Sequence, residues 1–499
     1  MSSELQSGAN YVWVINVYFL TCAIVQPLCG QLADLWGRRW IMLGSVLLFM
    51  AASAICGAAQ DTATLIVGRA VQGLGGGGIN MLVDVIICDL VPLVDRGSII
   101  GLLFALISMI SSFGPLIGGA LTSAGQWRWI FYLNLPLGAV ALAILFASLK
   151  VSHRGGLGWK QRVRRIDLVG NFILVASTVL ILYALTYGGS RYPCSNPQII
   201  ALLVAGLVLL TVFFFYERSP WCVFPVAPRI LFSNQTSVAA FFITFNHGML
   251  IYWATYFFPL YFQSVRGASP EQSGLNLLVL AFIFPFFTAV CGGILAKTSE
   301  YKILHIAGLG VTAIGFSVCS LLDQLSSTGM WVGLQLLVAA GLGIAMPALL
   351  PAVQAELSDE ESASSTGTWA FVRSLGSIWG VTVPAAVFSN RAFQLADTVQ
   401  GHFAREALMG GHAYEHGTAA FLDLFSGDTR EQIVNVFADS LRLSWWVGIA
   451  FAGVSLMAAL FERRVKLRQN LESDFGLQQG RQEANMEISQ GAGAHAREE

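Results

Sequence analysis

Charged residues are scarce in this sequence. Only 11% of its 499 residues are Asp, Glu, Lys or Arg, whereas 55% are hydrophobic. An ordinary soluble domain carries about 25% charged residues, because a large part of any globule faces water. The shortage of charge therefore excludes a soluble fold and indicates a chain that lipid covers.

The sequence also gives little indication of a metal site, a disulfide framework or a catalytic site. The eight cysteines lie mostly inside apolar runs and form no Cys-x-x-Cys pair, so neither a disulfide framework nor a zinc site is indicated. Asp84 and Asp89 suggest an intramembrane enzyme with a metal-bound diphosphate as an alternative, but no further carboxylates accompany them. We expect no enzyme activity, no cofactor and no metal. The net charge of −1, without a basic patch, gives no reason to expect nucleic acid as a partner.

Long apolar runs fill most of the chain. A helix that spans the hydrocarbon needs about 20 predominantly apolar residues, and these runs are too long and too uniform for the alternating strands of a membrane barrel. The sequence therefore predicts an all-α polytopic membrane protein with about thirteen transmembrane helices. The predicted segments are 11–31, 41–59, 65–90, 98–122, 127–149, 168–188, 197–216, 236–262, 272–296, 303–322, 330–352, 366–389 and 441–461.

The distribution of Lys and Arg predicts the orientation in the membrane. If the loop with Arg38 and Arg39 is cytoplasmic, the cytoplasmic segments carry seventeen Lys and Arg residues and the outer segments five. Positive residues favour the cytoplasmic side, so we expect an outer N-terminus and a cytoplasmic C-terminus. The glycosylation sequon at Asn234 then lies in the cytoplasm and should carry no glycan. Residues 1–10 lack the pattern of a cleaved signal peptide.

We divide the chain into four parts on this basis. Residues 1–149 form an N-terminal bundle, and residues 234–461 form a C-terminal bundle with a long outer loop at 390–440, part of which we expect to be amphipathic helix. Residues 150–233 between them hold a basic cytoplasmic loop and two linker helices. Residues 462–499 are a polar cytoplasmic tail of disordered composition.

The turn between the first two runs gathers charge and glycine. Gly30, Asp34, Gly37, Arg38 and Arg39 follow the spacing G-x-x-x-D-x-x-G-R-R. Glycine permits a tight turn and close helix approach, and the charges can pair with one another or with a neighbouring helix end. We interpret this turn as a conformational latch, with a plain basic loop as the alternative.

The third run holds the candidate residues for proton coupling, which are Arg69, Gln72, Gly73 and Asp84. An ionisable group at membrane depth is costly and usually faces a cavity or a partner. Because arginine does not titrate, Arg69 would act on a nearby carboxyl group or on ordered water. A structural arginine that binds backbone carbonyls is the alternative. Asp89 and Arg96, at the cytoplasmic end, are expected to form an ion pair.

Polar and aromatic residues inside the apolar runs of the second half are candidates for a substrate cavity. They are Asn246, His247, Trp253, Tyr256 and Arg373. Polar residues at this depth tend to line a cavity, and aromatic rings stack on flat ligands. Packing inside the helix bundle is the alternative for each of them.

These motifs resemble those of the major facilitator superfamily. The turn at 30–39 is similar to its cytoplasmic-loop motif, and Arg-x-x-Gln-Gly at 69–73 to a motif implicated in proton transfer. WRWIFYLNLPLG at 127–138 and RRIDLVGN at 164–171 resemble the fourteen-helix drug:proton antiporter branch, which includes fungal efflux pumps. The string G-P-x-x-G-G resembles the antiporter motif of that branch, although Ile110 stands where the family usually has glycine. The residues of this string are Gly114, Pro115, Gly118 and Gly119.

The resemblance implies two six-helix bundles with two extra helices between them, working by alternating access. It also implies one helix before the run at 11–31, with an intramembrane Asp in an L-D-x-T-I-V string. Residues 1–10 look like the outer loop that follows this helix. We therefore expect that the first bundle lacks its first helix here.

We accordingly expect a proton-coupled efflux transporter of small amphipathic organic molecules, such as drugs, secondary metabolites or toxins. Its expected partners are the substrate, protons and the lipid bilayer, and it is expected to be a monomer in the plasma membrane. A vacuolar or vesicular membrane is the alternative location. Two other functions stay open: a non-transporting sensor or truncated remnant of such a transporter, and an importer of a nutrient such as a siderophore.

Overall fold

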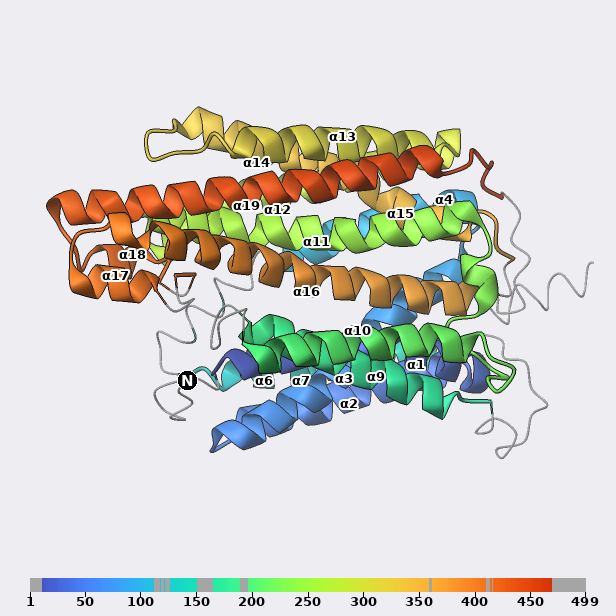
Figure 1. Cartoon of the computed structure of the whole chain (residues 1–499). Helices are drawn as coiled ribbons and strands as arrows, with labels where there is room; N and C mark the ends of the chain where they lie inside the picture. The colour runs from blue at the N-terminus through green and yellow to red at the C-terminus, as the bar shows by residue number, and fades with distance from the viewer. Residues whose placement is uncertain are drawn as a thin grey trace, which may run out of the picture.

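The computed structural model describes residues 11–111, 117, 121, 126–149, 165–188, 196–358, 361–409, 413–414 and 416–468. These residues form long helices that lie side by side (Figure 1). Ten described helical stretches are long and apolar enough to cross a membrane, and α9 is a shorter apolar helix. Each of the thirteen predicted segments contains a helix, so the predicted all-α polytopic fold is confirmed.

The helices of the first half are α1 (Tyr11–Trp36), α2 (Arg38–Ala58), α3 (Thr62–Leu90), α4 (Leu93–Ser111), α6 (Trp129–Tyr132) and α7 (Asn134–Ser148). The linker helices are α9 (Leu168–Tyr187) and α10 (Pro197–Glu217), followed by the short η2 (Arg229–Phe232). The second half contains α11 (Gln235–Ser264), α12 (Pro270–Thr298), α13 (Tyr301–Cys319), α14 (Thr328–Ala345), η3 (Met346–Ala348), α15 (Leu349–Gln354), α16 (Ser362–Leu395) and α19 (Gly427–Phe461). Its outer segment contains η5 (Ala396–Thr398), α17 (His402–Leu408) and α18 (Ala419–Leu422).

The glycine run of α3 lets this helix lie directly against its two neighbours. A Cβ atom at Gly73 would stand 2.5 Å from the carbonyl oxygen of Tyr18 on α1. One at Gly75 would stand 2.6 Å from the backbone nitrogen of Phe49 on α2. Lipid supplies no hydrophobic force between helices, so close backbone packing of this kind holds them together. α3 therefore lies between α1 and α2 in the first half.

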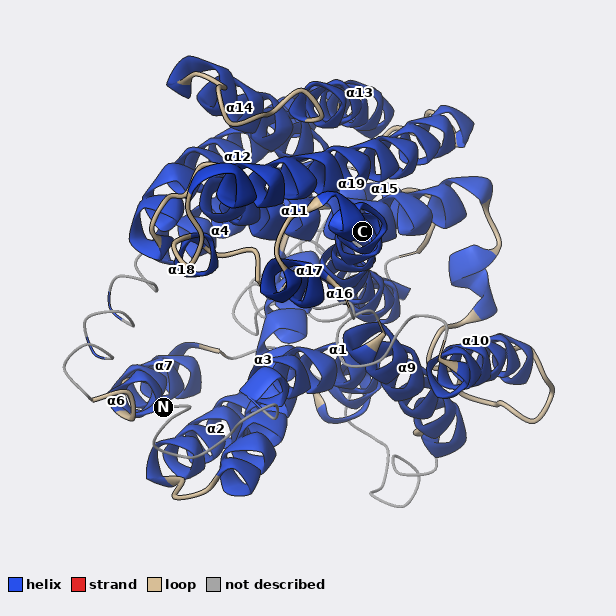
Figure 2. Cartoon of the chain, turned by 60° about the vertical axis from the view of Figure 1, so that its left-hand side comes forward, coloured by secondary structure: helices blue, strands red, loops and turns tan. Residues whose placement is uncertain are grey.

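Two helix pairs join the halves: α4 packs along α12, as Figure 2 shows, and α1 packs along α16. A Cβ atom at Gly292 of α12 would stand 2.6 Å from the carbonyl oxygen of Gly97 on α4. One at Gly30 of α1 would stand 3.6 Å from the carbonyl oxygen of Ala363 on α16. All four residues lie near the ends that the predicted orientation makes cytoplasmic, so the halves are closely apposed at that end.

The outer segment of the second half lies at 390–440, where the sequence predicts a long loop that is partly amphipathic helix. α16 extends to Leu395 and α19 begins at Gly427, so most of this range is helical. The segment between them is packed, since the side chains of Leu408 and Leu422 are fully buried. The ring of Tyr414 stacks on Phe257 of α11 with 5.7 Å between centroids. Scattered charges suggested a loop, but helices that extend beyond the lipid carry charges on their wet faces.

Candidate functional site

An ion pair joins the two halves inside the membrane-spanning region. Oδ2 of Asp84, on α3, lies 3.7 Å from Nη2 of Arg373, on α16. The side chain of Asp84 is 4% exposed and that of Arg373 is 18% exposed. A charge held away from water without a partner costs several kcal/mol. Each residue therefore stabilises the charge of the other, and the pair resists separation of α3 from α16.

Aromatic rings hold the guanidinium of Arg373. Its Cζ lies 4.3 Å from the ring centroid of Trp369 on the same helix, and 5.0 Å from that of Phe104 on α4. Its Nη1 is buried and makes no hydrogen bond to any of the described residues. A guanidinium has five N–H donors, so Arg373 retains donor capacity for a further acceptor.

A neutral polar contact on α1 accompanies this pair. Oγ of Ser374 donates a hydrogen bond to Oε1 of Gln26 at 3.2 Å, and Gln26 is 1% exposed. Gln26 was not among the residues predicted from the sequence, although a polar residue inside an apolar run is the same signal that indicated Asp84. We call Gln26, Asp84, Arg373 and Ser374 the inter-half polar site.

The turn between α1 and α2 brings together most of the predicted latch. Arg38 contacts Asp34 through Nη1 at 2.9 Å, and Asp89, near the end of α3, through Nε at 2.7 Å. Gly37 adopts φ 89° and ψ 148°, a conformation that side chains disfavour, which explains the glycine of the motif. Arg39 faces elsewhere and donates to the carbonyl oxygen of Phe146 on α7 at 2.7 Å.

Arg96 joins the halves at the same end of the molecule. We expected it to pair with Asp89, but the structure pairs Asp89 with Arg38. Arg96, which is 1% exposed, donates to Oε1 of Gln354 on α15 at 2.7 Å. Nε2 of Gln354 in turn donates to Oγ1 of Thr366 on α16 at 3.1 Å. Gln354 lies 258 residues from Arg96 in sequence, so local spacing gives no hint of this contact.

Arg69 lies far from Asp84. Its Nε donates to the carbonyl oxygen of Val14 at 3.0 Å, its Nη1 donates to Gln72 at 2.6 Å, and its Cζ lies 4.2 Å from the ring centroid of Tyr18. Asp84 stands on the same helix at about 22 Å, given a rise of 1.5 Å per residue. The structure therefore brings Arg69 and Gln72 together but leaves Asp84 apart from them. Arg69 makes the contacts expected of a structural arginine.

The candidate cavity residues of α11 point in different directions. Nε2 of His247 lies 2.9 Å from a carbonyl oxygen of α14, and Trp253 is fully buried against an aromatic ring of α13. Both face the interior of the second half. Asn246 donates to a carbonyl oxygen of its own helix. Tyr256 stacks on Tyr252 and remains 37% exposed.

The predicted antiporter helix face lies outside the described residues, because the description of α4 ends at Ser111. Its residues are Gly114, Pro115, Gly118 and Gly119. The described part of α4 contributes Phe104, beside Arg373, and Gly97, at the contact with α12.

A group of titratable side chains lies at the ends of the linker helices that the predicted orientation makes cytoplasmic. Asp167, Glu217 and Cys222 each place one possible ligand atom within 4.8 Å of the others. Protein donors already engage Asp167, since Tyr216 donates to it at 3.1 Å and Cys222 at 3.3 Å. Burial raises the pKa of the Cys222 thiol to about 12, and the hydrogen bond to Asp167 adds to the rise. The thiol stays protonated at neutral pH, and we assign this cluster to structural hydrogen bonding.

Two sets of membrane-length helices that meet across buried charges, with a charged turn at one end, define a polytopic membrane transporter. Residues 1–381 match the family model of the Major Facilitator Superfamily. This chain therefore belongs to the major facilitator superfamily, and it is an integral membrane transporter rather than an enzyme.

Similar proteins are known from several fungi. The chain is 47% identical over 472 residues to MFS-type efflux transporter ffsH of Aspergillus flavipes, covering 94% of this chain and 84% of that protein. It is 47% identical over 459 residues to MFS-type efflux transporter phmH of Phaeosphaeria nodorum, covering 90% and 81%. It is 42% identical over 480 residues to MFS-type efflux transporter pyiT of Pyricularia grisea, covering 94% and 80%.

Solved structures share the fold at low sequence identity. The proton:xylose symporter XylE bound to 6-bromo-6-deoxy-D-glucose has a TM-score of 0.54 and 14% identity, covering 89% of this chain and 92% of that chain. The human organic anion transporter MFSD10 has a TM-score of 0.54 and 16% identity, covering 90% and 83%. At these identities the likeness shows the fold alone.

Proposed function

We propose that this transporter exports small amphipathic organic molecules in exchange for protons, by alternating access of its two halves. The names of its fungal relatives, which describe efflux transporters, support export. The observation that carries proton exchange is the contact between Asp84 and Arg373. It places a titratable carboxyl group inside the membrane span and across the boundary between the halves.

Protonation of Asp84 changes the attraction between α3 and α16. The ionised carboxylate attracts Arg373, whereas the neutral acid leaves the guanidinium with its aromatic neighbours and no anion. A ligand shifts a conformational equilibrium only through its different affinity for the two states. A proton that binds Asp84 meets this condition, because it removes an interaction that exists only while the halves are together at this site.

The same site indicates which substrates it would accept. The aromatic rings of Trp369 and Phe104 beside Arg373 suit a molecule with a flat apolar body and a polar oxygen. A free carboxylate on the substrate would compete with Asp84 for Arg373 and so favour protonation of Asp84. Proton and substrate would then move together rather than in exchange. We therefore expect neutral or cationic amphipathic substrates.

Transport by the purified protein in lipid vesicles tests this proposal. With a panel of amphipathic dyes such as rhodamine 6G, an imposed pH gradient should drive dye against its concentration gradient. Asp84→Asn should reduce the gradient-driven rate at least about tenfold, because the side chain no longer titrates. Asp423→Asn, an exposed carboxylate on the outer segment, is the matched control and should transport normally.

Other outcomes of the same assay would contradict the proposal. Asp84→Asn vesicles that respond fully to the gradient would remove this carboxyl from coupling. If Arg69→Ala loses proton coupling while Asp84→Asn keeps it, proton coupling would be assigned to the outer end of α3. Dye that moves with the proton would indicate an importer, and no movement across the panel would favour a non-transporting protein.

We further place the protein in the plasma membrane as a monomer. A fluorescent fusion should outline the cell surface, and light scattering of the detergent-solubilised protein should give the mass of one chain. Fluorescence on vacuoles, or the mass of a dimer, would contradict these assignments.

A further inference from the structure

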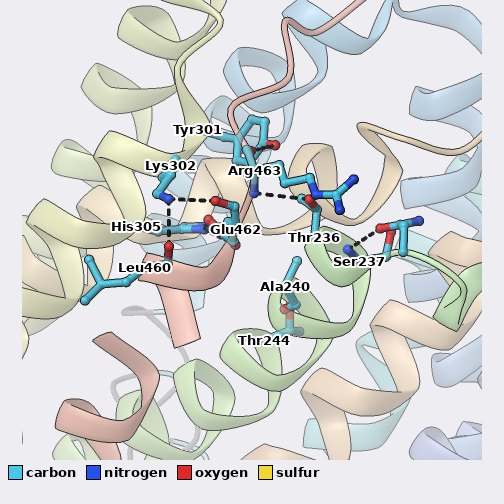
Figure 3. Close-up of polar contacts among 11 residues, drawn as sticks. Thr236, Ser237, Ala240, Thr244, Tyr301, Lys302, His305, Leu460, Glu462 and Arg463 are labelled. Atoms are coloured by element: carbon cyan, nitrogen blue, oxygen red, sulfur yellow. Dashed lines mark hydrogen bonds and ion pairs between the residues drawn. The ribbon is translucent and has the colours of Figure 1, made fainter. Parts of the chain in front are cut away.

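The chain that follows α19 packs against the helices instead of leaving them. The sequence predicts a polar tail from residue 462, yet residues 462–468 lie across the cytoplasmic ends of several helices, and Figure 3 shows where they begin. We call residues 462–468 the strap. Glu462 is 2% exposed and Leu467 is 3% exposed, so both ends of the strap are buried.

α13 binds the start of the strap with three polar side chains (Figure 3). Nδ1 of His305 lies 2.9 Å from Oε1 of Glu462, and both side chains are fully buried. Nζ of Lys302 donates to two carbonyl oxygens, including that of Glu462 at 2.6 Å. The hydroxyl of Tyr301 donates to the carbonyl oxygen of Arg463. The direction of the chain after α19 is therefore fixed by one helical turn of α13.

α11 binds the strap through Thr236. The N–H of Arg463 donates to Oγ1 of Thr236 at 3.2 Å, and this hydroxyl donates to Oε1 of Glu356 at 2.5 Å. Thr236 thus connects α11, the strap and the loop after α15. Thr244 lies about two turns further along α11 and is equally buried, but it donates only to the carbonyl oxygen of Ala240 in its own helix (Figure 3).

The far end of the strap reaches the first half. The N–H of Val94, at the start of α4, donates to the carbonyl oxygen of Arg468 at 3.2 Å. Nη2 of Arg468 donates to the carbonyl oxygen of Leu357, in the second half, at 2.5 Å. Val94 is 6% exposed, so water competes little for its contact. The strap is covalently part of the second half and hydrogen-bonded to the first.

We propose that the strap is a clasp that holds the cytoplasmic ends of the two halves together and must detach from α4 before the inward side opens. The proposal rests on the alternating-access part of the proposed function, and not on its proton coupling or substrate. A few hydrogen bonds bias an equilibrium between two conformations without locking it. A clasp of this size therefore sets how often the cytoplasmic side opens.

The thiol of Cys88 reports on this opening. Cys88 is fully buried where α3 meets the second half, with its Sγ 3.6 Å from Oγ1 of Thr366 on α16. A water-soluble maleimide reaches it only when the cytoplasmic ends separate. Mass spectrometry of the labelled peptide distinguishes Cys88 from the other cysteines, so the full-length chain can be used.

Two pairs of variants test the clasp. Thr236→Val removes the acceptor of the Arg463 N–H, and should raise the labelling rate of Cys88 about 5- to 30-fold, the factor that a loss of one or two kcal/mol produces. Thr244→Val, which loses only a bond within its own helix, should label at the unaltered rate. Arg468→Ala should also raise the rate, whereas Lys466→Ala, an exposed position of the strap, should not.

Equal labelling within each pair would overturn the proposal. If Thr236→Val does not fold, the variants at 468 and 466 still decide, because both positions follow α19 and their substitution changes no residue of a described helix. Faster labelling in a protein that exchanges no protons would support the clasp and refute the proposed coupling, so the two failures are distinguishable.

Discussion

In the first half of the chain, the turn between α1 and α2 places Arg38 between Asp34 and Asp89. In the second half, the turn between α12 and α13 leads to Lys302 and His305, which bind the strap. The first arrangement uses a permanent cation and residues of its own helices. The second uses an ammonium group and an imidazole together with the segment of chain that follows α19.

The two turns share neither a motif nor a backbone conformation. Each has one residue with positive φ, but Gly37 combines φ 89° with ψ 148°, whereas Ser299 lies in the left-handed helical region at φ 58° and ψ 19°. The sequence of the second turn, Ala296 to Lys302, also lacks the Gly-Arg pattern of the first. The two halves therefore use different backbone conformations and different contacts at these turns.

Removing Arg38 from the first turn should have the largest effect on the stability of the protein. Arg38→Ala leaves Asp89, which is 3% exposed, without its cation, at a cost of about 3–5 kcal/mol. We expect little folded protein and a much lower melting temperature in detergent, measured by fluorescence-detected size exclusion. Arg39→Ala is the matched control, because Arg39 donates only to an exposed carbonyl group. A similar loss in both variants would show that Asp89 does not depend on Arg38.

Exchanging the residue types of the two turns should have smaller effects of opposite sign. Gly37→Ala forces a side chain into a conformation that costs about 1–3 kcal/mol. Ser299→Gly relieves about 1–2 kcal/mol of left-handed strain and loses about 0.4–1 kcal/mol in the unfolded chain, a net gain of about 0.5–1 kcal/mol. Melting temperatures measured in one detergent check both. A drop in Ser299→Gly would mean that the second turn needs its hydroxyl.

The smallest expected effect on stability comes from Asp61, at the outer end of α3. Hydrogen bonds from the backbone and hydroxyl of Thr64 hold the pKa of Asp61, the N-cap of α3, below its ordinary value. A lowered pKa means that the cap stabilises the protein above about pH 4 and that this contribution fades as pH falls through the lowered pKa. Asp61→Ala should therefore melt slightly earlier at pH 7 and match the parent at low pH. A difference that persists below the lowered pKa would contradict the cap.

The helices and the first latch were predictable because both are local. Runs of about 20 apolar residues determine where a chain crosses lipid, and all thirteen expected segments contain a helix. The pairing of Asp34 with Arg38 was predictable because the two residues stand four positions apart on either side of the tight turn at Gly37.

Contacts between distant helices were not predictable in the same way. α11 is apolar on nearly all faces, so the sequence could not show that His247 and Trp253 face the interior of the second half. Asp84 was predictable as a candidate because a charged side chain in lipid costs free energy. Its pairing with Arg373 was not predictable, because Arg373 lies in the other half of the chain. The contact of Gln354 with Arg96 was not predictable, because it depends on how α15 packs near Arg96 in the folded chain.

The contact between α4 and α12 constrains how this sequence can change over time. Cβ atoms at Gly101 and Gly292 would stand 2.7 and 2.6 Å from carbonyl oxygens of the facing helix, and one at Gly97 would stand 2.8 Å from the carbonyl oxygen of Pro347 on η3. No rotamer can make room there, because the obstacle is backbone. A methyl group added at one of these three positions therefore requires the facing half to move away. A substitution there can persist only if the sequence of the other half changes with it.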